Sequence, residues 1–206
     1  MMFLKFRYAL WAIALATAVT TLAPSSAQAQ FRGGYAFLKA VESRDGTKAT
    51  EALQNDSTLI NSRHPDNGET ALAIATKRRD LTWVRFLLGK GADPAIADRQ
   101  GVTPLMHAAL LNFTDGATEL LGSKAPVDQS NRRGETALIL AVQARNTALV
   151  SLLVRNGANP DKSDHVAGLS ARGYAQRDDR TGSILSALDA KSDVAVRDGS
   201  AVFGPQ

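Results

Sequence analysis

The sequence contains no cysteine, and only 6% of its 206 residues are aromatic. Without cysteine there is no disulfide bond, no thiolate metal site, no cysteine nucleophile and no lipid attached through an N-terminal cysteine. A strong excess of one charge is also absent, since 24 Lys and Arg residues accompany 20 Asp and Glu residues. Two of the cations lie in residues 1–29, which have no acidic residue, so residues 30–206 carry 22 basic and 20 acidic residues. This small excess argues against nucleic acid as a partner, because nucleic-acid binding usually requires a clustered basic face.

Long apolar runs are missing except near the N-terminus. There, Lys5 and Arg7 precede an apolar stretch, and Ala27-Gln28-Ala29 has the small-x-small pattern that signal peptidase requires. We therefore expect a Sec-type signal peptide over residues 1–29, with cleavage after Ala29 and release into the periplasm or, alternatively, secretion. An uncleaved anchor would need about 20 apolar residues, more than this run provides. After cleavage, no segment is expected to enter a membrane.

A period of 33 residues organises the remainder. Gly68, Gly101 and Gly134 are spaced by 33 residues, and Gly168 follows after 34. When the units are aligned on these glycines, one equivalent position always holds Ser or Thr (the hydroxyl column) and another always holds alanine (the alanine column). The hydroxyl column is Thr70, Thr103, Thr136 and Ser170, and the alanine column is Ala75, Ala108, Ala141 and Ala175.

These columns indicate a helix-turn-helix unit. A Thr or Ser at the start of each unit can accept a hydrogen bond from a free backbone N–H and so cap the first helix. Alanine lets neighbouring helices approach closely, and paired branched residues such as Leu87-Leu88 supply the buried stripe of the second helix. Gly91 and Gly157 suit the left-handed end of that helix.

The segments Gly101-Val102-Thr103-Pro104-Leu105 and Gly157-Ala158-Asn159-Pro160 resemble the ankyrin repeat. The resemblance implies an all-α solenoid of about five helix-turn-helix repeats with β-turn loops. The expected domain covers residues 30–190, and a flexible C-terminal tail is expected over residues 191–206. The expected repeats cover about 34–66, 67–99, 100–132, 133–166 and 167–190.

Several positions depart from the family pattern. Arg79, Asn112 and Arg145 stand where the family has a glycine between the two helices. Gly116 and Ala117 occupy core positions of a second helix, so this helix is expected to be the softest, and replacing Gly116 with alanine is expected to stabilise it. Arg172 replaces a core leucine, which fits a terminal repeat that faces water.

No catalytic or metal-binding pattern is apparent. His64 and His165 are expected in loops and His107 on a helix, without the converging i, i+4 spacing of a zinc site. The carboxylates are expected at helix ends and in loops, where they cap and are solvated. We therefore expect no enzyme activity, no catalytic residue, no metal and no cofactor.

The resemblance implies that recognition residues lie at the loop tips and on the exposed face of the first helices. The expected partner is another protein, with an acidic or mixed-charge surface that binds a monomer of this chain. Arginine suits such contacts because its planar guanidinium binds carboxylates in a bidentate manner. The expected binding residues are Asp66, Asn67, Glu69, Lys77, Arg78, Arg99, Gln100, Val102, Leu110, Leu111, Arg132, Arg133, Glu135 and Gln143. An inhibitor or immunity-type protein that blocks an enzyme, and a secreted effector directed at a host, remain open as alternatives.

Overall fold

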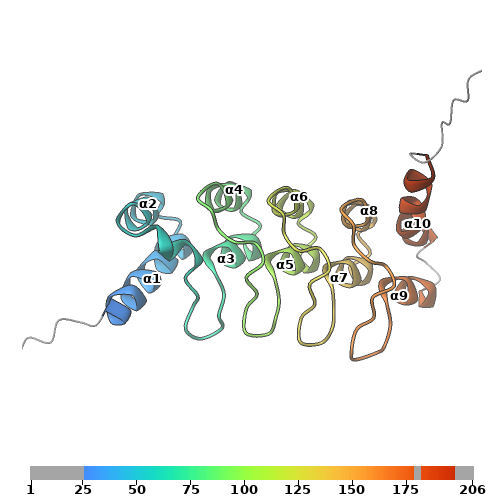
Figure 1. Cartoon of the computed structure of the whole chain (residues 1–206), viewed down its shortest axis with the longest axis horizontal. Coiled ribbons are helices and arrows are strands. Elements are labelled where there is room, and N and C mark those ends of the chain that lie inside the picture. The colour runs from blue at the N-terminus through green and yellow to red at the C-terminus, as the bar shows by residue number, and fades with distance from the viewer. Residues whose placement is uncertain (1–25, 179–181, 198–206) are drawn as a thin grey trace, which may run out of the picture.

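The computed structural model describes residues 26–178 and 182–197 of the chain. Within these residues it has ten α-helices, one short 3-10 helix and no strand, which confirms the predicted all-α repeat fold (Figure 1). The first two pairs and the 3-10 helix are α1 (Ser26–Glu42), α2 (Gly46–Asn55), η1 (Ser57–Asn61), α3 (Ala71–Lys77) and α4 (Leu81–Gly89). The remaining pairs are α5 (Pro104–Leu110), α6 (Thr114–Gly122), α7 (Ala137–Gln143), α8 (Thr147–Arg155), α9 (Ala171–Arg177) and α10 (Gly182–Arg197).

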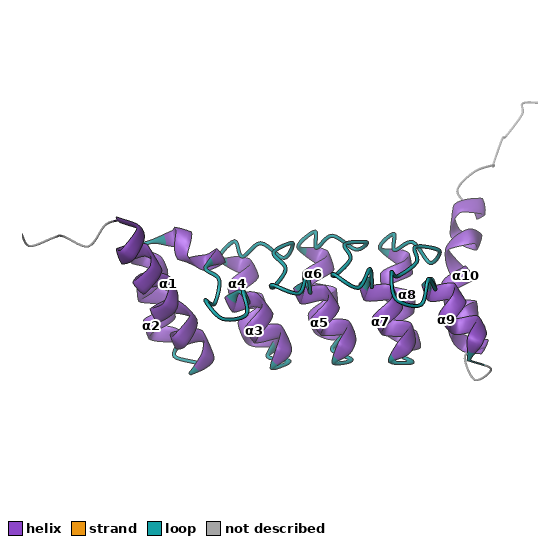
Figure 2. Cartoon of the chain, turned by 90° about the horizontal axis from the view of Figure 1, so that it is seen from below, coloured by secondary structure: helices purple, strands orange, loops and turns teal. Residues whose placement is uncertain are grey.

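The helices form an elongated stack of two rows. The inner helices, which we define as α3, α5, α7 and α9, lie side by side, with each one contacting the next, and α4, α6 and α8 form the second row (Figure 1). Four projecting loops, residues 62–70, 90–103, 123–136 and 156–170, extend from the inner row (Figures 1 and 2). This arrangement exposes the loops and one face of the inner helices along the length of the stack.

Each inner helix begins at the hydroxyl residue that the sequence predicts. The side chains of Thr70, Thr103, Thr136 and Ser170 accept hydrogen bonds from the backbone N–H three residues later. In α5, Pro104 follows the cap, where the missing N–H removes no helical hydrogen bond. The predicted N-caps are therefore confirmed in all four units.

The turn within each pair passes through a left-handed residue that is not glycine. Arg79, Asn112 and Arg145 have φ angles of 54°, 54° and 56°, a conformation that costs an L-residue about 1 kcal/mol. Each of these side chains also reaches the next unit, which offsets part of that cost. Arg79 lies over the Phe113 ring at 5.9 Å, Asn112 Oδ1 accepts from Asn146 Nδ2 at 3.1 Å, and Arg145 forms an ion pair with Asp178.

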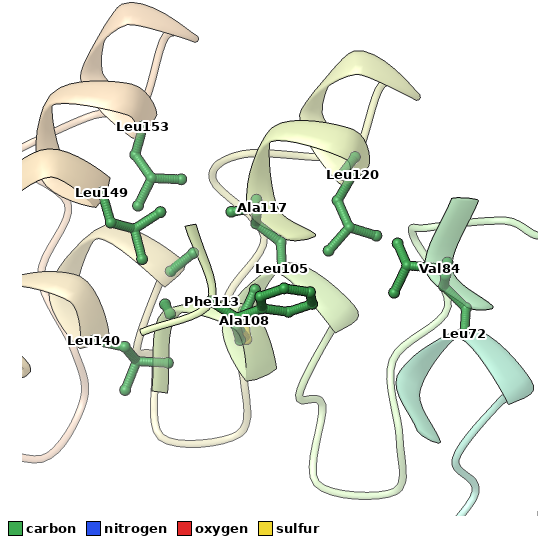
Figure 3. Packing of buried hydrophobic residues seen from close by; sticks show 14 of the residues in the cluster. Leu72, Val84, Leu105, Ala108, Phe113, Ala117, Leu120, Leu140, Leu149 and Leu153 are labelled. Carbon is green, nitrogen blue, oxygen red and sulfur yellow. The ribbon is translucent and has the colours of Figure 1, made fainter. Parts of the chain in front are cut away.

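Phe113 fills the space that small residues leave in the third unit. Its ring is buried and lies among Leu105, Ala108 and Ala117 (Figure 3). A Cβ atom placed on Gly116 would lie only 2.2 Å from Cε1 of this ring. The expectation that alanine at position 116 would stabilise the helix is therefore corrected: the missing side chain is replaced by an aromatic ring from the helix N-cap position.

The two ends of the stack differ from its middle. Arg172 is paired with Asp161 and Asp189 at 3.0 and 2.5 Å, which agrees with a polar terminal unit. The last helix, α10, continues to Arg197, so the segment from residue 191, expected to be a flexible tail, begins as helix. Residues 1–25 of the expected signal peptide and residues 198–206 of the tail lie outside the described residues. None of the helices in the described ranges has the length and apolarity that a membrane span requires.

Candidate functional site

The projecting loops are tied together by a ladder of backbone hydrogen bonds. Arg99 N donates to Asn67 O at 2.9 Å, Arg132 N to Gln100 O at 3.0 Å, and His165 N to Arg133 O at 2.8 Å. The glycine column permits this approach: Gly134 has a φ of 80°, and a Cβ atom there would lie 2.6 Å from His165 N. Successive tips therefore form one continuous edge with a fixed spacing.

The three tip arginines have different environments. Arg99 donates to the carbonyl oxygens of Pro65 and Asp66 in the preceding loop, so its guanidinium stabilises loop stacking. Arg133 lies 3.5 Å from Glu135 and is largely exposed. Arg132 is exposed, and within the described part of the chain its side chain has no hydrogen bond or ion pair. Arg132 is thus the tip cation most available to a partner.

Other predicted binding residues also differ in how far they are already engaged. Arg78 donates to the carbonyl oxygens of Val41 and Glu42 at 2.7 and 2.8 Å, and so holds the C-terminus of α1 against the second unit. Val102 is half-buried against the core. Asp66, Asn67, Gln100 and Gln143 are exposed, although the Asn67 side chain accepts from Glu69 N.

Two leucines of the third unit are exposed at the end of α5. Leu110 and Leu111 keep 50% and 37% of their accessible surface, whereas Phe113, two residues on, is buried. The seven residues of α5 separate the leucines from the loop side by about 10 Å. The loop tips and the two leucines thus lie at opposite margins of the inner face of the third unit, with the tips at the start of the inner helix and the leucines at its end.

Glu69 and Glu135, predicted to lie at the tips, are instead buried at the bases of their loops. Glu69 is 8% exposed and accepts a hydrogen bond from Lys77 Nζ at 2.5 Å. Glu135 is 7% exposed and accepts from Asn131 Nδ2 at 2.8 Å. Both carboxylates therefore line the base of the inner face, below the loop edge.

The structure also brings together a group that the sequence analysis did not identify. One ligand atom each of Glu69, Asp98 and His107 lies within 4.8 Å of the others. His107 is only 9% exposed, and its buried Nε2, which lies 3.7 Å from Asp98 Oδ2, has no hydrogen bond within the described ranges. Burial lowers the pKa of His107, and the charges of Asp98 and Glu69 oppose this effect only in part. The neutral imidazole is therefore favoured near pH 7.

A signal for this cluster was present in the repeat alignment. His107 and Tyr174 occupy equivalent positions on α5 and α9, and each follows a loop carboxylate, Asp98 or Asp164. Tyr174 donates from its hydroxyl to Asp164 Oδ2 at 2.5 Å. Tyr174 also lines an open hollow of about 390 Å³ at the last inner helix. The other lining residues are Val142, Gln143, Arg145, Arg177 and Asp178.

Comparison with known proteins agrees with this architecture. The family model described as ankyrin repeats in three copies matches residues 37–131 and 96–164, and the chain belongs to the ankyrin-repeat family. Ankyrin repeats indicate a module for protein–protein interaction.

Individual relatives are similar over part of their length. A putative ankyrin repeat-containing protein of Treponema pallidum is 34% identical over 53% of this chain and 37% of its own length. A putative ankyrin repeat protein of fowlpox virus is 35% identical over 55% of this chain and 35% of its own length. A match to an L-asparaginase of Dirofilaria immitis covers 24% of this chain and only 8% of that protein. The chain thus spans little more than a third of the length of the Treponema and fowlpox virus relatives. The short match to the asparaginase gives no basis for assigning catalysis.

Proposed function

We propose that the protein is a periplasmic binding module that holds an acidic or mixed-charge partner protein across its second to fourth units. The observation that supports this most is the pair of margins on the third unit. Arg132, on one side, has no hydrogen bond or ion pair from its side chain among the described residues, and Leu110, on the other, is half-exposed. An exposed arginine can bind a partner carboxylate in a bidentate manner. Exposed leucines next to a polar rim supply apolar area for the same contact.

The rigid loop edge strengthens the proposal. Because backbone hydrogen bonds join consecutive loops, little conformational entropy has to be lost when a partner docks. Arg99 and Arg78 belong to this scaffold rather than to the free surface, since their guanidinium groups already donate to backbone carbonyls. We therefore assign recognition chiefly to Arg132, Arg133, Leu110 and Leu111.

The test compares matched baits. The mature chain, the variant Arg132→Glu/Arg133→Glu and the control Lys90→Glu/Arg155→Glu are each immobilised and exposed to a periplasmic extract. The control makes the same change of charge at exposed residues near the ends of α4 and α8. A protein captured by parent and control but lost from the tip variant is the expected result, with the parent interaction weakening steeply as salt is added.

Purified candidate and parent then give the kinetic test. The tip variant should associate more slowly, because charge steering acts mainly on the association rate, while Leu110→Ser and Leu111→Ser should mainly speed dissociation. Thermal stability should barely change with the charge reversals, since exposed ion pairs contribute little to folding. Equal binding by all variants would refute the assignment of this surface.

A further inference from the structure

His107 has an unmet hydrogen-bonding requirement inside the stack. Its Nε2 is buried and has no hydrogen-bond partner among the described residues, and Asp98 Oδ2 lies 3.7 Å away, beyond hydrogen-bond reach. Leaving a buried polar atom without a hydrogen bond destabilises the folded state. The equivalent pair in the last unit has no such deficit, since Tyr174 donates directly to Asp164. In the intervening unit, the equivalent position holds the apolar Leu140.

The atoms around Nε2 are those that a divalent cation prefers. Glu69 and Asp98 contribute carboxylates from the bases of two successive loops, and both side chains are close to nine-tenths buried. Asp98 Oδ1 is held by the backbone N–H groups of Gln100 and Val102, at 2.8 and 2.9 Å, which leaves Oδ2 turned toward His107. A neutral imidazole and two carboxylates form a nitrogen and oxygen donor set suited to zinc and its neighbours.

We propose that Glu69, Asp98 and His107 form a binding site for a divalent transition-metal ion, with Zn²⁺ as the best match. Ligands of a tetrahedral zinc ion, each at about 2.0–2.2 Å from the metal, lie about 3.3–3.6 Å from one another. The distance of 3.7 Å between His107 Nε2 and Asp98 Oδ2 is close to this value, and all three ligand atoms lie within 4.8 Å. Closing the remaining gap requires only a small movement of the Glu69 carboxylate. Solvent or a partner side chain completes the coordination.

Lys77 would compete with a metal ion for the carboxylate of Glu69. Its ammonium group donates to Glu69 Oε1 and neutralises one of the two carboxylates. The Lys77 side chain is 43% exposed, so it can withdraw to solvent when a metal ion takes its place. Metal binding would thus link the second and third units through Glu69 and His107 and release a cation on the inner face.

The experiment titrates the tag-free, chelator-treated chain with Zn²⁺ in a calorimeter and with Co²⁺ in a spectrophotometer. Parent protein should bind one Zn²⁺ per chain saturably, and Co²⁺ should give the visible bands of low-coordinate cobalt. His107→Asn and Asp98→Asn should each weaken binding at least about tenfold, as changes of even second-shell partners often do. Asp98→Asn retains Oδ1 as the acceptor for the loop, and circular dichroism monitors the folding of each variant.

Two further variants separate the proposal from a purely structural cluster. Lys77→Gln should tighten Zn²⁺ binding several-fold, because it removes the competing charge; a purely structural ion pair predicts no gain. His165→Asn, a change in an exposed loop, should leave binding unaltered. Absence of saturable binding up to about 1 mM Zn²⁺ in both the parent and Lys77→Gln would overturn the proposal. Undiminished binding by folded Asp98→Asn and His107→Asn would overturn it as well.

Discussion

Replacing Gly116 with alanine should destabilise the protein, even though alanine is the better helix former. The intrinsic gain in an exposed helix would be about 1 kcal/mol. At this position, however, the new Cβ would lie 2.2 and 2.3 Å from Cε1 and Cδ1 of Phe113. The ring is buried and cannot move without disturbing its neighbours, and overpacking of this kind costs about 1–3 kcal/mol. We expect a net loss of up to about 2 kcal/mol.

Phe113 itself stands at the N-cap position of α6, where the equivalent residues of α4 and α8 cap their helices with a side chain. Asp80 and Asn146 accept a hydrogen bond from the third residue of α4 and α8, whereas α6 has no side-chain cap. Phe113→Asn should therefore gain about 1 kcal/mol from a restored cap. It should also lose about 3–5 kcal/mol through the removed ring, which leaves a net loss of about 2–4 kcal/mol.

The double variant Phe113→Asn/Gly116→Leu provides the decisive comparison. It copies the arrangement of Asn146 and the fully buried Leu149 in the next unit, so leucine should refill the space that the ring vacates. The free energy of unfolding of the double variant should exceed, by at least about 1 kcal/mol, the value predicted by adding the effects of Phe113→Asn and Gly116→Leu measured singly. Equilibrium urea unfolding of the four proteins of this cycle gives that coupling energy.

Gly122→Ala is the matched control, because Gly122 lies in the same helix with nothing within 4 Å of an added Cβ. It should be neutral or stabilising, by at most about 1 kcal/mol. If Gly116→Ala proved as stabilising as this control, or if the double cycle were additive, the assigned packing of Phe113 over Gly116 would be refuted.

Two further predictions concern the last unit and the N-terminus. Burial alone would raise the pKa of Asp164, but hydrogen bonds from the Tyr174 hydroxyl and three backbone N–H groups outweigh it and lower that pKa. Tyr174→Phe removes one of these hydrogen bonds and should therefore cost about 1 kcal/mol of unfolding free energy at pH 7. Because the pKa of Asp164 is lowered in the folded state, this stabilisation is present above the pKa of the unfolded chain and is lost as the pH falls below about 4. The melting temperatures of parent and variant should therefore converge in acid. A difference in melting temperature that did not change with pH would contradict the assignment. Protein made in a Gram-negative host should begin at Gln30 by intact-mass analysis, and recovery of a full-length species from membranes would favour an uncleaved anchor.

Much of the fold was predictable from the sequence because its determinants are local and repeated. The hydroxyl residues at 70, 103, 136 and 170 act on N–H groups only three residues away, so their capping role could be identified without tertiary information. The period of 33 residues then predicted that successive helix pairs would stack, since a single pair cannot bury its own apolar stripe. The sequence also identifies Arg79, Asn112 and Arg145 as departures from the glycine that the family has between the two helices, and these three residues have left-handed φ angles.

How side chains from different units meet depends instead on the packing of the stack in three dimensions. Arg99 and Arg132 look alike in the repeat alignment, but the Arg99 side chain donates to the preceding loop, whereas that of Arg132 has no hydrogen bond or ion pair in the part of the chain that the structure describes. Gly116 looks like a weak point, and only packing reveals that Phe113 fills its space. Glu69, Asp98 and His107 come from two units and converge through the stacking of loops. A one-dimensional pattern determines which residues share a column, whereas burial and contact between columns depend on side-chain directions that no local rule determines.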